Sequence, residues 1–245
     1  IGMPSSSVLE PVMYLYNRTK EKRYLDFAKY IVGQWETPGG PQLISKAIAD
    51  VPVANRFPHP KTWFSRENGQ KAYEMMSCYE GLLELYKVTG NPLYLSVVEK
   101  TVGHIVREEI NVAGSGSAFE CWYGGKERQT QPTYHTMETC VTFTWMQLCN
   151  RLLQMTGNSL YADYMETARD NALMASLKAD ASQIAKYSPW EGWRHVGEEQ
   201  SGTHIHWCNA PSPRAFALIP QSAYQVQAEC VLVTFSAPSE AALVW

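Results

Sequence analysis

Apolar residues recur at helical spacing in three stretches of the chain, and each stretch ends at a similar polar turn. In the middle stretch, Met75, Cys78, Leu82 and Leu85 fall on one face of a helix, which is the pattern of a helix packed against a core. The stretch stops at residues 89–92, Thr-Gly-Asn-Pro, where Gly suits the residue after a helix and Pro cannot continue one. The pattern predicts a helix, a tight turn and a second helix.

This hairpin occurs three times in the chain. Each copy has a Thr at the end of its first helix and a Tyr five residues later, and the copies recur at intervals of 70 and 67 residues. Self-similarity of this kind indicates a repeated structural unit. We therefore expect three αα-hairpins. The repeated segments 9–19, 79–89 and 146–156 form the C-terminal parts of the first helices. The second helices are expected at about 21–36, 92–110 and 159–177.

Long connections, at about 37–69, 113–135 and 186–214, separate the hairpins. Connections of this length inside a compact helical domain are usually functional. Alternating inner and outer helices with long loops at one end describe an α/α toroid. We therefore predict an all-α fold in which residues 1–218 form part of an (α/α)6 toroid, with six helices as half of the ring.

The pattern changes beyond Arg214. Residues 224–235 alternate and contain the β-branched side chains of a strand, so we expect 219–245 to begin a β-sandwich. Because the chain starts at Ile1 and ends within this strand region, we expect it to be part of a longer protein. A half ring would expose apolar helix flanks, which predicts a homo-oligomeric or aggregation-prone fragment.

Composition and charge narrow the choice of partners. The chain has 245 residues and a net charge of −3, with 21 basic and 24 acidic side chains. It therefore has no positive excess to hold a nucleic acid. No apolar run approaches the roughly 20 residues that cross a bilayer, so we expect no membrane span. The six cysteines lack the spacing of a disulfide scaffold, and nothing in the sequence indicates a cellular location.

Carboxylate, thiol and imidazole side chains in two segments are candidate metal ligands. Glu138 and Cys140 open the third hairpin, where the positive end of a helix favours anionic side chains. His204, His206 and Cys208 share one side if their segment is extended, and nitrogen and sulfur donors suit Zn²⁺. Together they predict a four-ligand zinc site. The alternative is a capping carboxylate, buried cysteines and a polar loop with a hydrogen-bonded histidine.

A second carboxylate lies in a turn rich in Gly and Ser. Residues 114–122 read Gly-Ser-Gly-Ser-Ala-Phe-Glu-Cys-Trp, which places Glu120 among aromatic residues. Such packing removes water from a carboxyl group and raises its pKa, as a general acid near neutral pH requires. A solvated loop glutamate is the alternative. A phosphate-binding loop is excluded, because no Gly-Lys-Ser/Thr follows.

Aromatic side chains in the connections are typical of a groove that binds sugars, because flat rings stack on sugar faces. Our candidates for substrate contacts are Trp122, His135, His204 and Trp207. Many of the eight Trp and fourteen Tyr residues will instead belong to the core.

Taken together, these motifs resemble the β-L-arabinofuranosidase-like glycoside hydrolases, family 127 and its relatives. The likeness covers nearly the whole chain. It is carried by the repeated turn, which reads Leu-Tyr-x-x-Thr-Gly in its second copy, and by residues 71–78, 114–122, 138–140 and 204–214. It implies a longer protein, in which an N-terminal stretch completes an (α/α)6 barrel and β-domains follow.

The resemblance also implies a retaining mechanism, in which a zinc-bound cysteine thiolate attacks the anomeric carbon and a glutamic acid protonates the leaving oxygen. Glu120 stands at the position of the family's acid/base, and Glu138 and Cys140 match two zinc ligands. Cys208 matches the second cysteine of a pair that precedes an arginine, here Arg214.

Trp207 takes the place of the first cysteine of that pair, which is the family's nucleophile and also a metal ligand. Three outcomes are open. His206 could supply the missing ligand while Cys140, Cys208 or Cys121 attacks. A water could be the nucleophile, which would make the enzyme inverting. Catalysis could also be lost, leaving a groove that binds glycan.

We predict a glycosidase that cleaves L-arabinofuranoside-type linkages in an oligosaccharide or glycoside substrate. Glu120 is the expected general acid, and Zn²⁺ is expected on Glu138 and the two thiols. Lys71 stands where some family members carry a sugar-contacting histidine, so Lys71 is a further candidate substrate contact and the substrate pocket is expected to differ. A sugar lyase or epimerase is a further alternative, with Tyr134 or His135 as its base.

Overall fold

The computed structural model describes residues 6–56, 71–131, 135–190, 207–226, 230–235, 238–240 and 242. It confirms the three predicted αα-hairpins. They pair α2 (Leu9–Thr19) with α3 (Lys22–Trp35), α5 (Ala72–Thr89) with α6 (Pro92–Glu108), and α7 (Thr139–Thr156) with α8 (Leu160–Ala168). A π-helical turn, η2 (Arg169–Leu173), continues α8 into the short α9 (Met174–Ser176).

The repeated threonine has the same role in all three turns. The hydroxyl groups of Thr19, Thr89 and Thr156 donate to the carbonyl four residues earlier, at 2.7 to 2.9 Å. Each also accepts the backbone N–H two residues later. The next residue is left-handed, with φ of 59°, 65° and 69°, and it is Lys20 in the first turn and Gly in the others. The sequence repeat is therefore a repeated helix-ending motif.

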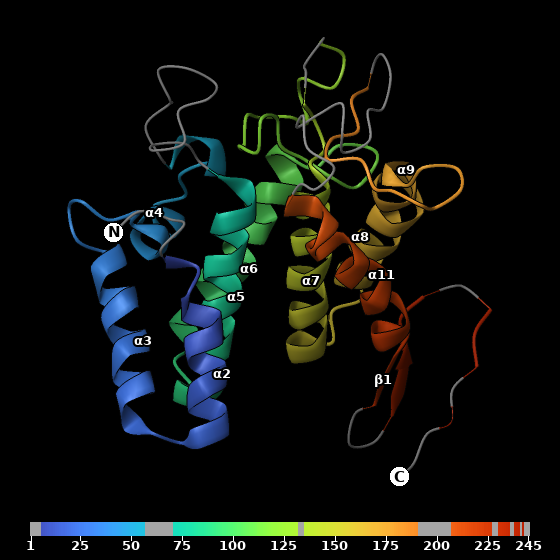
Figure 1. The fold of residues 1–245 in the computed structure, drawn as a ribbon. Helices are drawn as coiled ribbons and strands as arrows, with labels where there is room; N and C mark the ends of the chain where they lie inside the picture. The colour runs from blue at the N-terminus through green and yellow to red at the C-terminus, as the bar shows by residue number, and fades with distance from the viewer. Residues whose placement is uncertain are drawn as a thin grey trace.

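The hairpins stand side by side, so that their first helices form an inner row and their second helices an outer row (Figure 1). In the inner row α5 packs between α2 and α7, and α7 also packs against a further helix, α11 (Pro211–Ser222). The inner helices α5 and α7 are buried over most of their length. This arc of inner and outer helices is the predicted partial toroid.

Helix α11 is not predicted by the sequence pattern, because Pro211, Pro213 and Pro220 make its segment resemble a connection. Proline is tolerated in the first turn of a helix, where the backbone N–H groups have no helical partner. Pro211 therefore begins the helix without breaking it. The helix also runs across residue 218, so the predicted division into 1–218 and 219–245 passes through it and stays a prediction.

Arg151 connects all three inner helices. Its guanidinium on α7 contacts the carboxylates of Glu84 on α5 and Glu10 on α2, and it donates to the Tyr14 hydroxyl at 2.6 Å. The Arg151 side chain is largely buried between these acids. Buried charges need such partners, since an unpaired ion inside a protein is costly.

The strand expected over 224–235 is instead a hairpin of two short strands, β1 (Tyr224–Val226) and β2 (Val231–Val233). They pair antiparallel, with Tyr224 opposite Val233. Within the described residues, this hairpin is the extent of the predicted sandwich.

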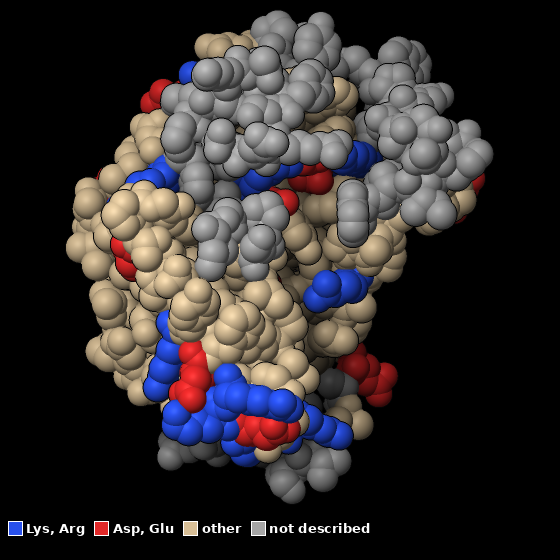
Figure 2. Space-filling model, turned by 60° about the vertical axis from the view of Figure 1, so that its left-hand side comes forward, with Lys and Arg blue, Asp and Glu red and all other residues tan. Residues whose placement is uncertain are grey.

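The described parts of the connections between hairpins lie at one end of the helices (Figure 1). The first connection holds two short helices that the sequence pattern does not predict, α4 (Leu43–Ile48) and the 3-10 turn η1 (Val53–Asn55). On the face drawn in Figure 2, acidic and basic side chains lie beside one another and form no continuous basic surface. None of the described helices has the length and apolar character needed to cross a membrane.

Candidate functional site

Three predicted metal ligands converge at the loop end of α7. The sulfur atoms of Cys140 and Cys208 lie 2.7 Å apart, and the Cys208 sulfur is 3.7 Å from Oε1 of Glu138. The ligand atoms of all three residues lie within 4.8 Å of one another. All three side chains are buried, and neither cysteine forms a disulfide. The structure therefore brings together residues from two distant segments, as the sequence predicts.

Local structure explains how these ligands meet. Glu138 is the residue before α7, and Thr139 anchors this helix start by donating its N–H to Lys186 O at 2.9 Å and its hydroxyl to Ala185 O at 2.7 Å. Cys208 lies in the 3-10 turn η3 (Trp207–Asn209), which packs on both α7 and α11. Two elements thus present their side chains to one buried point.

The electrostatics of this cluster suit a cation. Burial, together with the neighbouring Cys208, raises the pKa of the Glu138 carboxyl well above its usual range. The hydrogen bond with Cys208, together with burial, raises the pKa of the Cys140 thiol. The Oε2 atom of Glu138 is buried without a hydrogen-bond partner. Buried polar atoms rarely stay unpaired, and one carboxylate with two sulfurs is a donor set that Zn²⁺ accepts.

Glu120 lies at the tip of a tight two-residue turn. Ala118 and Cys121 exchange both backbone hydrogen bonds, each at 2.9 Å, across the turn residues Phe119 and Glu120. Both turn residues are left-handed, with φ of 49° and 72°. Such a turn usually takes Asn or Gly, and a left-handed residue with a side chain costs roughly 1–2 kcal/mol. Strain of this kind gathers at functional sites.

Two lysines and a tyrosine surround the Glu120 carboxylate. Lys71 contacts Oε2, while the Lys186 ammonium lies 3.0 Å and the Tyr187 hydroxyl 3.3 Å from Oε1. Burial acts to raise the pKa of Glu120, but Lys71 and Lys186 outweigh it and lower that pKa. The predicted rise in the pKa of Glu120 is therefore wrong for this structure, because the two lysine ammonium groups together outweigh burial.

Lys186 and Tyr187 are functional-site candidates that the sequence reasoning missed. They lie in the last long connection, close to the start of α7, and both approach Glu120. A lysine and a tyrosine in a loop carry no distinctive spacing, so no sequence signal marks them. Lys71 was expected to contact substrate, and in this structure its ammonium contacts Glu120 instead.

The other predicted residues fall in different surroundings. Trp122 is fully buried in the hydrophobic core, so it offers no ring face to a sugar and we do not propose it as a substrate contact. The His135 ring lies 4.7 Å from the rings of both Phe119 and Tyr187. Burial raises the pKa of Cys121 to about 11, which disfavours its thiolate.

Several predicted residues lie outside the described part of the chain. His204, His206 and Tyr134 belong to segments that the structure does not describe. For Trp207 the backbone is described, as part of η3, but its side chain is not. The predicted fourth metal ligand and the predicted aromatic sugar contacts in this segment therefore stay predictions.

A comparison with known protein families assigns this arrangement. The family described as "Beta-L-arabinofuranosidase, GH127 catalytic domain" matches residues 3–213. The chain belongs to this family. The match spans the three hairpins and all three clustered ligands, and it ends within α11. No protein with a curated description matches the chain.

Solved structures share the fold of this GH127 chain. A GH127 β-arabinofuranosidase superposes with a TM-score of 0.68 at 19% identity, covering 93% of this chain and 34% of its own. A structure named as a glycoside hydrolase gives 0.64 at 19% identity, covering 94% and 40%. A GH127 β-L-arabinofuranosidase from Geobacillus stearothermophilus gives 0.62 at 15% identity, covering 91% and 38%. The chain thus spans less than half the length of these proteins.

Proposed function

We propose that this GH127 chain provides the acid/base and metal-binding part of a glycoside hydrolase that cleaves L-arabinofuranoside linkages. The observation that carries the proposal is the meeting of Glu138, Cys140 and Cys208 at one buried point. Membership of the family supports the reaction class. The substrate is an oligosaccharide or a simple glycoside that ends in this sugar.

Glu120 is the proposed general acid. Lys186 contacts both the Glu120 carboxyl group and the thiol cluster. Its ammonium lies against Glu120, and its backbone carbonyl oxygen lies 4.0 Å from the Cys208 sulfur. In the absence of substrate, Lys71 and Lys186 favour the ionised carboxylate. Proton donation to the leaving oxygen therefore requires sugar hydroxyls to take over at least one of these lysine contacts.

Zn²⁺ is the proposed metal. Glu138, Cys140 and Cys208 would hold it, and His206, in the undescribed segment, is the proposed fourth ligand. The ion would supply the positive charge that keeps both coordinated thiols ionised. Without such a charge, burial raises the pKa of the Glu138 carboxyl, and the Cys208 contact together with burial raises the pKa of the Cys140 thiol, so both groups favour their neutral forms.

Cys208 is the proposed nucleophile. A thiolate is a strong attacking group, and Cys208 is the cysteine next to the residue, Trp207, that replaces the usual family nucleophile. Its sulfur would form a bond to the anomeric carbon as the leaving oxygen takes a proton from Glu120. Water, deprotonated by Glu120, would then displace the sulfur, giving net retention of configuration.

Substitution of Glu120 tests the proposal. In the full-length protein, Glu120→Gln should lower the release of L-arabinose from a β-linked furanoside by about 100-fold or more. Glu127→Gln, an exposed change on the same loop, is the matched control. Full activity of Glu120→Gln would show that Glu120 is not the general acid. Proton NMR of the first-formed sugar anomer shows whether the anomeric configuration is retained or inverted. Inversion would contradict the role of Cys208 as the nucleophile.

A non-catalytic carbohydrate-binding protein is the second candidate. It is favoured by one observation, that Lys71 and Lys186 occupy both oxygens of Glu120. Metal analysis and turnover assays distinguish the two. One zinc ion per chain with turnover supports the hydrolase, whereas binding of arabinan oligosaccharides without metal or turnover supports the binding protein.

A further inference from the structure

A second buried carboxylate, Glu109, holds the loop that carries Glu120. Glu109 follows α6 and is fully buried. Its Oε2 accepts the backbone N–H groups of Tyr123, Gly124 and Gly125, each at 3.1 Å, and its Oε1 accepts Gly124 N–H at 2.9 Å. Three successive amides thus point at one carboxylate, which is a nest-like arrangement for an anion.

These three amides begin only three residues after Glu120. Between them lie Cys121, which pairs with Lys71 as an isolated β-bridge, and the fully buried Trp122. The chain from the acid to the Glu109 contacts therefore has little freedom to move. The turn at Phe119 and Glu120 has two left-handed residues with side chains, so its shape depends on what fixes its two arms.

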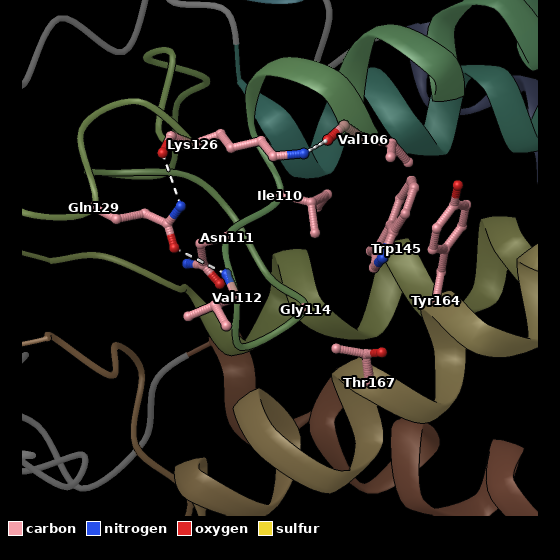
Figure 3. Close-up of a pocket in the computed structure, with 10 residues that line it drawn as sticks. All are labelled: Val106, Ile110, Asn111, Val112, Gly114, Lys126, Gln129, Trp145, Tyr164 and Thr167. Atoms are coloured by element: carbon pink, nitrogen blue, oxygen red, sulfur yellow. Dashed lines mark hydrogen bonds between the residues drawn. The ribbon is translucent and has the colours of Figure 1, made fainter.

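Other contacts hold the same loop farther from Glu120, at the end of α6 (Figure 3). The Lys126 ammonium donates to Val106 O at 3.1 Å, and the Gln129 side chain accepts Val112 N–H at 2.9 Å and donates to Lys126 O. The Lys126 contact is exposed to solvent, whereas Glu109 is not. In its ionised form Glu109 is also a charged acceptor, which makes stronger hydrogen bonds than a neutral one.

We propose that Glu109 is a positioning residue, which fixes the arm of the Glu120 turn and so sets where the acid stands relative to the substrate. The role in catalysis rests on the proposed hydrolase function, but the hold on the loop does not. The carboxyl oxygens of Glu109 accept all three amides, whereas a glutamine presents its own N–H₂ group to some of them.

The test compares Glu109→Gln with Glu127→Gln in the full-length protein. We expect Glu109→Gln to lower kcat by about tenfold or more while KM changes much less, because a small misplacement of an acid slows the reaction step. Hydrogen exchange, followed by mass spectrometry, should become faster in peptides covering residues 118–125. Glu127→Gln, which removes an exposed charge from the same loop, should change neither measurement.

Unchanged kcat and unchanged exchange in Glu109→Gln would overturn the proposal. An equal loss of activity in Glu127→Gln would also overturn it, since loop charge would then be the cause. If Glu109→Gln does not fold, Glu109→Asp keeps the charge on a shorter arm and should still show faster exchange and lower kcat. If the wild-type protein has no turnover, the hydrolase proposal fails, and exchange alone decides whether Glu109 holds the loop.

Discussion

Cys140 and Cys208 are separated by 68 positions in the chain, yet their sulfur atoms lie 2.7 Å apart beside Glu138. The proximity of two buried thiols that form no disulfide, next to a carboxylate oxygen without a hydrogen-bond partner, is the basis of the proposed metal site. It also makes the site testable without any substrate, because metal content and thermal stability can both be measured on the resting protein.

Removal of one thiol should abolish metal binding. We expect the wild-type protein to contain zinc and to gain Tm when Zn²⁺ is added, and we expect Cys140→Ser to lose both properties. A ligand at 100 times its Kd stabilises the folded state by about 2.7 kcal/mol. The exposed Cys230 provides the control, since Cys230→Ser should keep the metal. Equal zinc content in the wild type and Cys140→Ser would show that the cluster is not the site.

Loss of the Lys71 ammonium should raise the pKa of Glu120. Burial already acts in that direction, and Lys71 is the largest influence that opposes it. In Lys71→Met the Glu120 carboxyl group should keep its proton to higher pH. The alkaline limb of the profile of kcat/KM against pH should therefore move to higher pH. Lys29→Met removes an exposed lysine far along the chain and should leave the limb in place. Movement of this limb to lower pH in Lys71→Met would contradict the assignment of Glu120 as the general acid.

Glu109 should make folding stability depend on pH. Burial raises its folded-state pKa from 4.5 to about 7, so between these values the folded state binds more protons than the unfolded state. The contribution of Glu109 is therefore complete below about pH 4.5 and is lost as pH rises through 7. Each pKa unit corresponds to about 1.4 kcal/mol, so the change is of the order of 3 kcal/mol.

Denaturant unfolding at several pH values measures this dependence. The free energy of unfolding of Glu109→Gln should change less between pH 4.5 and 7 than that of the wild type. Glu127→Gln, with its exposed side chain, should follow the wild-type curve. Parallel curves for the wild type and Glu109→Gln would indicate that the folded protein does not shift this carboxyl group.

Glycine at position 20 should stabilise the turn between the two helices of the first hairpin. Lys20 has φ of 59°, in the position that Gly90 and Gly157 occupy in the other two hairpins. Relief of this left-handed conformation in Lys20→Gly should raise the free energy of unfolding by up to about 1 kcal/mol. Gly90→Lys should lower it by a similar amount, because an added Cβ meets no atom there and only the backbone is strained. Thermal unfolding of the two variants compares them directly.

The hairpin repeats and the clustering of Glu138 with Cys140 could be predicted from the sequence for a physical reason. Helical periodicity and the Thr-Gly ending are local signals, and Glu138 with Cys140 stands at a recognisable helix start. Helix α11 could not be predicted from the sequence, because prolines such as Pro211 are common both at the start of a helix and in loops. Local sequence does not tell them apart.

The surroundings of Glu120 were not accessible in the same way. The turn places its carboxylate between Lys71 and Lys186, which come from positions 49 residues before it and 66 residues after it. The pKa of Glu120 depends on these distant charges more than on its aromatic neighbours in sequence. Contacts of this type follow from the assembled fold alone.

Arg151 gives the array a property that stacked repeats usually lack. In a simple solenoid each unit touches its neighbours alone, so units can melt one after another. Here a residue of the third hairpin reaches acids in both the second and the first. Detaching the first hairpin would remove one of the two carboxylates that pair with the buried Arg151 guanidinium, so we expect the three hairpins to unfold together as one cooperative unit.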